Sequence, residues 1–388
     1  MDGRIIVLLN GETVQALAMG KWLKKAGYRV WAVCDDKVSY GYNSPYAERK
    51  IIAPPVHEAE DDFHEFFLGF INKNHIDGVI PMNDYSASYL SKHKDVLSEK
   101  VRFVIPDWNT FITAYDKNRL MEVCHDGGFP HPATIDLSKM KADEACVHMR
   151  FPALIKPNIT TGGRGFALVQ DATELKAKLP SIQKAYGDCH LQEFIPAGGR
   201  QFKVSLFMDK EHRVVNTTVF HKVRFYPENG GSSCCSVSVV RPDLQRVCTA
   251  VLEKIGWYGF ADFDMIEDPR DGIVKIMEIN PRVPACVKLS LVSGVNFAAN
   301  IADTTIGKKP EKYNYSTGQV LRYSALDALW FLYSRQRFKT KPGWFNFFGR
   351  KVHYQDYGGI RAFMVGNFAG FIKQLSPSFR KAKADGNI

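Results

Sequence analysis

The sequence predicts an α/β fold that opens with a parallel sheet, and three observations support this class. A buried-strand pattern, RIIVLLNG, begins at Arg4 and is followed by helical periodicity over 12–25, which Gly27 ends. A second strand pattern, YRVWAVC, completes a strand-helix-strand unit. Much later, GFADFDMI and IVKIMEIN flank the turn EDPRDG and predict two neighbouring strands. With 388 residues, the chain is long enough for two or three packed units.

The remaining elements follow in order along the chain. A helix in FHEFFLGFINKNH precedes the strand DGVIPM, and a helix that carries Lys117 ends at two glycines. The strands FPALIKPN and GFALV are joined by ITTGGRG, and a helix to about Ala185 leads to a strand in CHLQEFI. QFKVSLFMD and RVVNTTVF predict a hairpin, FYPENGGSSCC predicts a loop, and 242–255 predict a helix.

Composition and charge narrow the function classes. The net charge is +10, and the segment 330–388 holds most of it, with eleven Lys or Arg against two acids. This distribution predicts one local basic patch and no nucleic-acid partner. The eight cysteines show no zinc-ligand spacing, and we expect reduced thiols in a cytoplasmic protein. No apolar run has the length of a signal segment or of a membrane-spanning helix.

The glycine-rich segment ITTGGRG has the composition of a phosphate-binding loop. Its glycines leave backbone N–H groups accessible, as a phosphate cradle requires. It lacks the G-K-[ST] ending of a Walker P-loop, so a hairpin turn without function stays open as the alternative. Lys156 favours phosphate binding, because a lysine inside the apolar strand FPALIKP is an unusual packing residue.

Acidic and amide side chains share one face of the last two predicted strands. Alternate strand residues point the same way, so Glu278, Asn280 and Arg282 share a side, as do Asp262 and Asp264. Oxygen ligands of this kind suit magnesium better than zinc. A solvated or hydrogen-bonded acidic cluster is the alternative that spacing alone leaves open.

Together these segments resemble the ATP-grasp family, in particular its single-module carboxylate–amine ligases. SPYAERKIIAPP, DKNRLMEVCHDGGFPHPAT, FPALIKPNITTGGRGFALV, LQEFI and MEINPR occur in the family's order, up to about Pro310. The resemblance implies an ATP-grasp fold of the α/β class, with an N-terminal Rossmann-like pre-ATP-grasp domain over 1–112. The ATP-grasp domain would cover 113–312, with a small lid subdomain at about 125–192 and a large subdomain at about 193–312. A C-terminal basic and aromatic extension would occupy 313–388.

The resemblance also implies a role for individual residues. The phosphate-binding residues would be Lys117, Lys156, Thr161, Gly162, Gly163 and Gly165. Adenine and ribose would be held by Gln192, Glu193, the backbone near Ile195, and Gln201, which stands where many relatives have an acid. The metal ligands would be Asp264, Glu278 and Asn280, with Asp262 as a rival to Asp264. Arg282 and Lys156 would be catalytic, with Arg282 steadying the transferred phosphoryl group or the tetrahedral intermediate.

The activity implied by the resemblance is an ATP-dependent ligation that uses Mg²⁺ or Mn²⁺. A small-molecule carboxylate would become an acyl phosphate, and an amine, such as an amino acid or a cell-surface precursor, would then attack it. Carbamoyl-phosphate synthesis is disfavoured because it uses two tandem modules, and no biotin-carrier segment supports a carboxylase. A non-catalytic nucleotide-binding scaffold is the alternative from a different class. His221, Lys222, Arg224 and the loop 230–233 are either substrate contacts or a surface hairpin, and Asn83 and Asp84 are further cleft candidates.

The C-terminal segment interleaves bases with aromatic residues. FLYSRQRFKTKPGWFNFFGRK is typical of an interfacial membrane contact but also of a small subdomain that packs its aromatics on the core. The second interpretation is favoured, and peripheral association with an anionic membrane or a lipid-linked acceptor through 330–388 stays open. Residues 363–372 predict an apolar helix face too short to span a bilayer. A homodimer is also left open.

Overall fold

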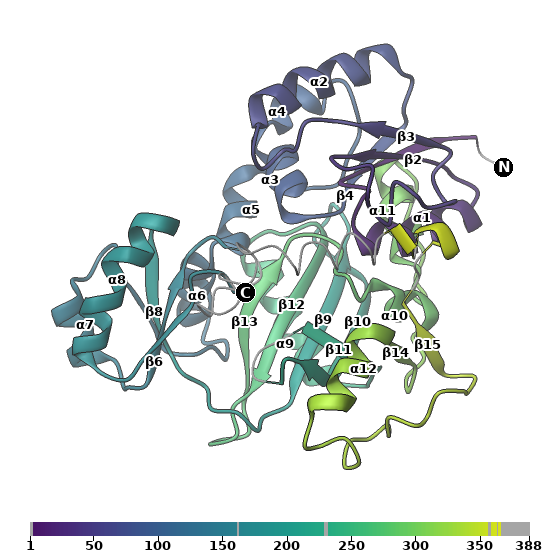
Figure 1. Cartoon of the computed structure of the whole chain (residues 1–388). Helices are drawn as coiled ribbons and strands as arrows, with labels where there is room; N and C mark the ends of the chain where they lie inside the picture. Colours follow the sequence, from purple (N-terminus) through teal and green to yellow (C-terminus); the bar gives the residue numbers. More distant parts are fainter. Residues whose placement is uncertain (1–2, 161–162, 229–231, 356–357, 363, 366–388) are drawn as a thin grey trace. The chain divides into compact units, whose positions relative to one another are not determined.

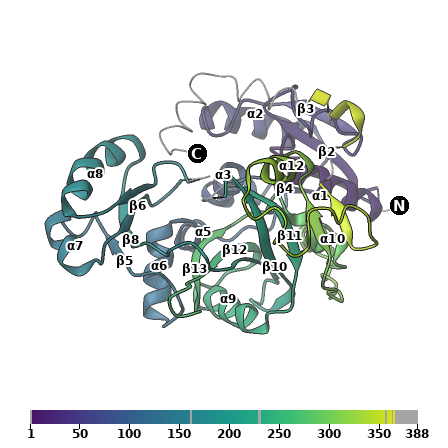
Figure 2. The same cartoon turned by 60° about the horizontal axis from the view of Figure 1, so that its bottom comes forward.

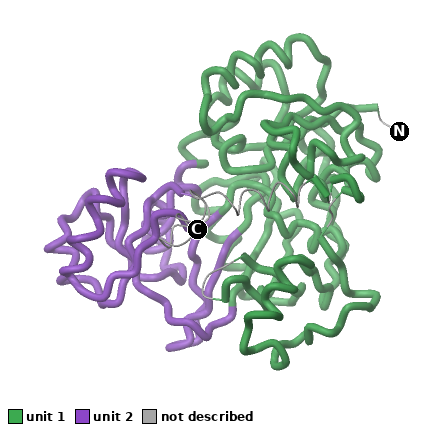
Figure 3. The backbone as a smooth tube through the Cα atoms, viewed as in Figure 1, with its two compact units in different colours: residues 1–111, 201–262, 280–369 green, residues 112–200, 263–279, 370–388 purple. Residues whose placement is uncertain are grey.

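The computed structural model describes residues 3–160, 163–228, 232–355, 358–362 and 364–365 (Figure 1). The chain forms two compact units, shown in Figure 3. The first unit contains 1–111, 201–262 and 280–369, and the second contains 112–200, 263–279 and 370–388. The predicted domain boundaries stay predictions.

The first unit opens with the predicted parallel sheet. Its strands are β1 (Ile5–Leu9), β2 (Arg29–Cys34), β3 (Arg49–Ile52) and β4 (Gly78–Pro81), in the order β3-β2-β1-β4. All three strand pairs are parallel. The connecting helices are α1 (Val14–Lys25), α2 (Glu60–Lys73), α3 (Asp84–Lys92), α4 (Lys94–Leu97) and α5 (Trp108–Tyr115). The sequence did not predict β3, because this short edge strand is half exposed and lacks an apolar run.

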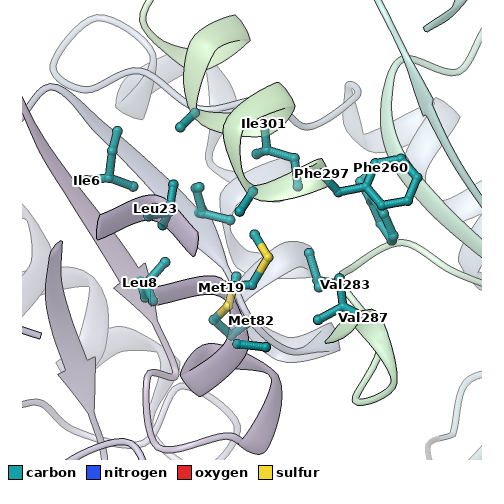
Figure 4. Packing of buried hydrophobic residues seen from close by; sticks show 14 of the residues in the cluster. Ile6, Leu8, Met19, Leu23, Met82, Phe260, Val283, Val287, Phe297 and Ile301 are labelled. Atoms are coloured by element: carbon teal, nitrogen blue, oxygen red, sulfur yellow. The ribbon is translucent and has the colours of Figure 1, made fainter. Parts of the chain in front are cut away.

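Two later helices complete the core of this unit. α10 (Val287–Val292) and α11 (Phe297–Thr305) pack against α1. Their buried side chains meet those of β1 and α1 in one apolar cluster, which Figure 4 shows around Met19, Leu23 and Ile301. Helices far apart in sequence therefore stabilise the parallel sheet through a shared core.

The largest sheet has seven strands in the order β13-β12-β9-β10-β11-β14-β15. Its members are β9 (Gln201–Met208), β10 (Val214–Tyr226), β11 (Ser232–Ser238), β12 (Gly259–Glu267), β13 (Val274–Asn280), β14 (Val320–Arg322) and β15 (Val352–Tyr354). β9 and β10 form the predicted hairpin. The predicted loop FYPENGGSSCC is wrong in part, because its end belongs to β11, which pairs with β10 and β14. α9 (Pro242–Lys254) packs against β9 and β10 (Figure 2).

The second unit contains a four-stranded sheet in the order β5-β8-β6-β7. Its strands are β5 (Thr134–Asp136), β6 (Ala153–Pro157), β7 (Ala167–Val169) and β8 (Cys189–Glu193), and all the pairs are antiparallel. Its helices are α6 (Lys117–Asp126), α7 (Ala142–His148) and α8 (Ala172–Tyr186). A separate apolar cluster that includes Leu175 and Leu191 forms the core of this sheet.

Seven of the eight cysteines are buried, and Cys146 is half-buried. All eight cysteines are free thiols, and burial raises the pKa of the Cys235 thiol to about 12. Such a thiol is protonated at neutral pH and is a poor metal ligand. In the described part of the chain, no helix combines the length and the apolar character that crossing a membrane would require. Phe363 and residues 366–372, where an apolar helix face is predicted, lie outside the described residues.

Candidate functional site

Lys156 occupies a buried position on β6. Its side chain is only 6% exposed, and its Nζ donates a hydrogen bond of 2.6 Å to Oε1 of Gln192 on β8. Nζ also lies 4.9 Å from the centre of the Phe166 ring. One neutral acceptor and one ring face compensate an ammonium group poorly for lost water. The site therefore favours an additional negative charge beside Lys156.

Lys117 and Glu278 are the two charged residues that act electrostatically on Lys156. Nζ of Lys117, at the start of α6, donates to the carbonyl oxygen of Thr160 over 2.9 Å and lies 3.5 Å from Oε2 of Glu278. Burial lowers the pKa of Lys156 to about 8, with Glu278 acting against this shift and Lys117 adding to it. When protonated, the two lysines exceed the single carboxylate in charge. This excess suits an anion with several negative charges, such as a triphosphate.

His190 lies opposite Lys156 on β8, and the sequence did not predict its role. It is fully buried, and its Nδ1 lies 2.8 Å from Oδ1 of Asn158. Burial, with further contributions from Lys156 and Lys117, lowers the pKa of His190 well below its usual range. The ring is therefore neutral at physiological pH and orients the strands without adding a third positive charge. No sequence signal marks it, because a lone buried histidine has no characteristic spacing.

The side chain of Glu193, at the predicted adenine hinge, is engaged in ion pairs. Its carboxylate lies 3.2 Å from Nζ of Lys275 and pairs with Arg270. Burial alone would raise its pKa, but hydrogen bonds from the Ala133 amide, Lys275 and Arg270 lower it. The Glu193 side chain therefore fixes the hinge in the second unit. The Gln192 side chain is fully buried and bonds Lys156 and Thr134, so adenine recognition would fall to the backbone near Ile195, which is half-buried.

The glycine-rich loop has the conformational signature of a tight backbone cradle in its described part. Gly163 and Gly165 have φ values of 72° and 75°, in the left-handed region that favours glycine. A Cβ on Gly165 would lie 2.8 Å from both Pro157 and Tyr186, so a side chain there would force the loop apart. Thr161 and Gly162, the other predicted loop residues, lie outside the described residues.

A second constellation, in the first unit, centres on Arg282. Its Nε lies 3.2 Å from a carboxylate oxygen of Asp84, the first residue of α3. Its Nη2 donates a hydrogen bond of 3.1 Å to Oδ1 of Asn280, at the end of β13. The side chain of Asn83 caps α3 by accepting from the Ser86 amide over 2.9 Å. The segment PMNDY therefore contributes an acid that orients the guanidinium of Arg282.

The two candidate metal acids differ in their surroundings. Asp262 is fully buried, accepts a 2.7 Å hydrogen bond from the Ser205 hydroxyl, and pairs with Lys203. Asp264, two residues further along β12, is partly exposed. Because Asp262 is fully buried whereas Asp264 is partly exposed, Asp264 is the better candidate for a metal ligand.

The residues predicted to contact ribose and substrate differ in their burial and contacts. Gln201 is half-buried at the start of β9, opposite Lys222 on β10. Arg224 is fully buried and forms bonds of 2.6 and 3.0 Å to the carboxylate of Asp327. Substrate contact by Arg224 is therefore wrong, because its guanidinium is already satisfied inside the protein. The ring of His221 lies 5.5 Å from that of Phe202, and 230–231 are outside the described residues.

The candidate oxygen ligands on β12 and β13 suit a magnesium ion that also binds water and phosphate better than a metal ion coordinated by protein side chains alone. Over the described ranges, no three His, Cys, Asp or Glu side chains gather as a metal-binding group. Asp264, Glu278 and Asn280 offer two carboxylates and an amide on β12 and β13. Mg²⁺ typically takes one or two carboxylates and completes its shell with water and phosphate oxygens. This donor set therefore suits a magnesium ion that arrives with a nucleotide.

The family model that matches the chain is that of the ATP-grasp domain, over residues 114–286. Residues 114–286, a little under half of the chain, therefore form an ATP-grasp domain. Its boundaries include both lysines, the glycine-rich loop, the hinge, and the end of β13 with Arg282. The predicted resemblance to the ATP-grasp family and the predicted α/β fold with an N-terminal parallel sheet are confirmed, whereas the C-terminal extension stays a prediction.

Similar proteins agree with this assignment. D-aspartate ligase of Enterococcus faecium is 29% identical over 263 residues, which cover 62% of each chain. The carbamoyl phosphate synthase large chain of Neisseria meningitidis is 24% identical over 193 residues, or 48% of this chain and 18% of the relative. The biotin carboxylase of Campylobacter jejuni, solved as a β-γ-ATP complex, matches with a TM-score of 0.68 and 15% identity. That match covers 81% of this chain and 74% of the carboxylase, and at this identity it shows the fold alone.

The chain spans less than two thirds of the length of these curated relatives. The match to the synthase covers less than a fifth of that protein. The ATP-grasp domain is therefore shown, whereas the activity of the whole protein has to be argued from its residues.

Proposed function

We propose that the chain is an ATP- and magnesium-dependent ligase that activates a carboxylate as an acyl phosphate and joins it to an amine. The observation that carries this proposal is the buried Lys156, held beside Lys117 and Glu278 in an ATP-grasp domain. A lysine that is buried with few compensating contacts is costly unless an anion binds beside it. A nucleotide triphosphate supplies that charge.

The proposed roles follow from the contacts of each residue. Lys117 and Lys156 bind phosphate oxygens, and Gly163 and Gly165 shape the loop that covers them. Asp264, Glu278 and Asn280 would hold magnesium, which would supply positive charge to neutralise the phosphates. Alternate residues of a strand lie about 7 Å apart on one face, so Glu278 and Asn280 can serve one metal-nucleotide group. The same role would be available to Mn²⁺.

The chemistry requires no covalent enzyme nucleophile. A carboxylate oxygen attacks the γ-phosphorus of ATP, the bond to the bridging oxygen of ADP breaks, and an acyl phosphate forms. The amine then attacks the acyl carbon, loses a proton, and displaces phosphate to leave an amide. Arg282, oriented by Asp84, stabilises the negative charge that develops on the oxygen of the tetrahedral intermediate.

We further propose that the acid is an amino acid. The support is the similarity to a D-aspartate ligase, whose name assigns it an acidic amino acid. The amine would be another amino acid or a precursor of the cell surface. We also propose a cytoplasmic location, a homodimer and a lipid-linked acceptor. Cell fractionation during purification tests the location, sedimentation tests the dimer, and assays with lipid-linked amines test the acceptor.

The test is ADP release by the full chain with Mg-ATP and a panel of D- and L-amino acids, offered singly and in pairs with amines. The proposal predicts acid-dependent ADP release that increases with a suitable amine. A matched variant, Lys156→Met, should lose this release, whereas Lys176→Met, at an exposed position on α8, should keep it. ATP binding without ADP release for any acid would instead support the non-catalytic scaffold.

A further inference from the structure

The connection between α12 (Ser324–Tyr333) and β15 is a loop, residues 334–351, that the ligase chemistry does not use. Beneath it lies a buried charge cluster of the first unit. Arg224 and Arg322 both bond the carboxylate of Asp327, at distances of 2.6 to 3.0 Å, and all three side chains are at most 3% exposed. One carboxylate thus holds two guanidinium groups, whose remaining donors are available to the loop.

These donors fix the backbone of the loop. Arg224 donates to the carbonyl oxygen of Pro342 over 2.8 Å, and Arg322 donates to that of Asn346 over 3.0 Å. The indole N–H of Trp344 donates to the carbonyl oxygen of Asp327 over 2.9 Å. Three hydrogen bonds within five residues hold the chain from Pro342 to Asn346 against the buried cluster. The loop therefore has a defined backbone conformation (Figure 1, between α12 and β15).

Although the loop is held, several of its aromatic side chains face water. Trp344 stacks on Phe331 at 4.0 Å, yet Phe338, Phe345 and Phe348 are 76, 63 and 93% exposed. Among the described residues, every phenylalanine that is at least 36% exposed lies in this loop. The rings of Phe338 and Phe345 stack at 6.4 Å, so they form one continuous apolar patch. Exposed apolar patches of this kind commonly mark interaction surfaces.

All the charged side chains of the same loop are basic. Its bases are Arg335, Arg337, Lys339, Lys341, Arg350 and Lys351, and the segment 334–351 contains no Asp or Glu. All six except Arg337 are exposed. The aromatic patch is thus flanked on both sides by bases. Its partner must accept apolar rings and provide negative charge over the same area.

We propose that the loop 334–351 docks the protein on a membrane surface that contains anionic lipid headgroups. Aromatic rings lie favourably at the boundary between headgroups and acyl chains, and each nearby base adds attraction to anionic lipid. A second copy of the chain fits this surface poorly, because pairing equivalent loops would bring six like charges on each side together. The proposal concerns a surface contact and is independent of the proposed ligase activity.

Co-sedimentation of the full chain with lipid vesicles tests this proposal. One set of vesicles contains phosphatidylcholine alone, and the other contains phosphatidylcholine with about one third phosphatidylglycerol. The proposal predicts binding to the anionic set, reduced at least tenfold at 0.5 M NaCl because salt screens the bases. Phe345→Ser combined with Phe348→Ser, and Lys339→Gln combined with Lys341→Gln, should each reduce binding at least tenfold.

Matched controls distinguish the loop from the general surface. Val147→Ser with Val240→Ser removes two exposed apolar side chains elsewhere, and Lys308→Gln with Lys309→Gln removes two exposed charges elsewhere. Both controls should bind as the wild type does, and all four variants should keep the wild-type melting temperature. Absence of binding to anionic vesicles would overturn the proposal, as would equal binding by the loop variants. Concentration-dependent dimers that the phenylalanine variant abolishes would overturn it in favour of a second copy.

Discussion

Nζ of Lys117 lies 3.5 Å from Oε2 of Glu278, so a phosphate-binding candidate and a metal-binding candidate form an ion pair. The lysine is buried, and about one third of the Glu278 side chain is exposed. In this arrangement, the carboxylate compensates the lysine before a ligand binds. Binding of a metal-nucleotide complex would give each of them a new partner of opposite charge, and until then the ion pair holds both side chains in position.

Glu278→Gln should reduce turnover at least a hundredfold, because the variant loses a metal ligand and leaves Lys117 without its carboxylate. The apparent Mg²⁺ requirement should rise, as measured by ADP release over a magnesium titration. Glu174→Gln, at a half-exposed position in the first turn of α8, is the matched control and should leave both quantities unchanged. An unchanged magnesium dependence in Glu278→Gln would contradict the metal assignment.

Nucleotide affinity should fall as the pH rises above 8. Burial lowers the pKa of Lys156 from the ordinary value of 10.5 to about 8, so the free protein loses this charge between pH 8 and pH 9. Nucleotide phosphates favour the ammonium form of Lys156, so nucleotide binding raises the pKa of Lys156 and takes up a proton. The affinity should therefore fall by at most about tenfold for each pH unit above 8. Titration calorimetry from pH 7 to pH 9.5 measures this dependence. Lys156→Met should show a flatter profile, and parallel profiles would contradict the role of Lys156.

The same shift predicts the sign of the effect on stability. The unfolded chain keeps Lys156 protonated up to about pH 10.5, whereas the folded chain releases the proton near pH 8. Between these values the unfolded state binds more protons, so the contribution of Lys156 to the free energy of unfolding rises with pH. Denaturant unfolding of the wild type and of Lys156→Met at pH 7.5 and 9.5 isolates this contribution. If the free energy of unfolding of the wild type decreased from pH 7.5 to pH 9.5 relative to that of Lys156→Met, the prediction would be contradicted.

Asp262→Asn and Asp264→Asn should have different effects, although the two acids share one face of β12. Asp262 is fully buried with Ser205 and Lys203, so its substitution should lower the free energy of unfolding by about 3 kcal/mol. Asp264→Asn should leave stability within about 0.5 kcal/mol and reduce turnover with a raised magnesium requirement. Denaturant unfolding together with a magnesium titration distinguishes them. The reverse assignment would follow if Asp262→Asn alone changed the magnesium requirement.

Asp327→Asn should destabilise the first unit strongly, because Arg224 and Arg322 would lose their shared carboxylate inside the protein. The expected loss in free energy of unfolding is about 3–5 kcal/mol. Asp243→Asn, which breaks a half-exposed pair with Arg241, is the control and should cost less than about 1 kcal/mol. Equal effects of the two substitutions would mean that the buried cluster contributes little.

The sequence predicted those features that depend on local pattern. Helical periodicity located α1, and apolar runs located β1, β2 and β4, because these elements bury continuous faces. Lys156 stood out for the opposite reason, as a charge inside an apolar run. Ordered motifs then gave the ATP-grasp assignment. The half-exposed β3 and the polar β11 escaped prediction, because their pairing with neighbouring strands determines them.

Long-range contacts account for the rest. Arg224 has the sequence context of a surface hairpin, and only its bond to Asp327, more than a hundred residues later, shows that it is structural. The neutral His190 and the pairing of Asp84 with Arg282 likewise join segments that no local pattern connects. Separating Asp262 from Asp264 required their surroundings, since spacing treats the two acids alike.

The most direct test of the central claim is to trap the acyl phosphate with hydroxylamine. The purified full chain is incubated with Mg-ATP, hydroxylamine and one amino acid at a time, and the amino acids include D- and L-aspartate. Hydroxamate and ADP are quantified in the same samples. We expect hydroxamate equal in amount to the ADP released for at least one acid, and none with Lys156→Met. ADP release without hydroxamate for every acid would contradict activation of a carboxylate as an acyl phosphate.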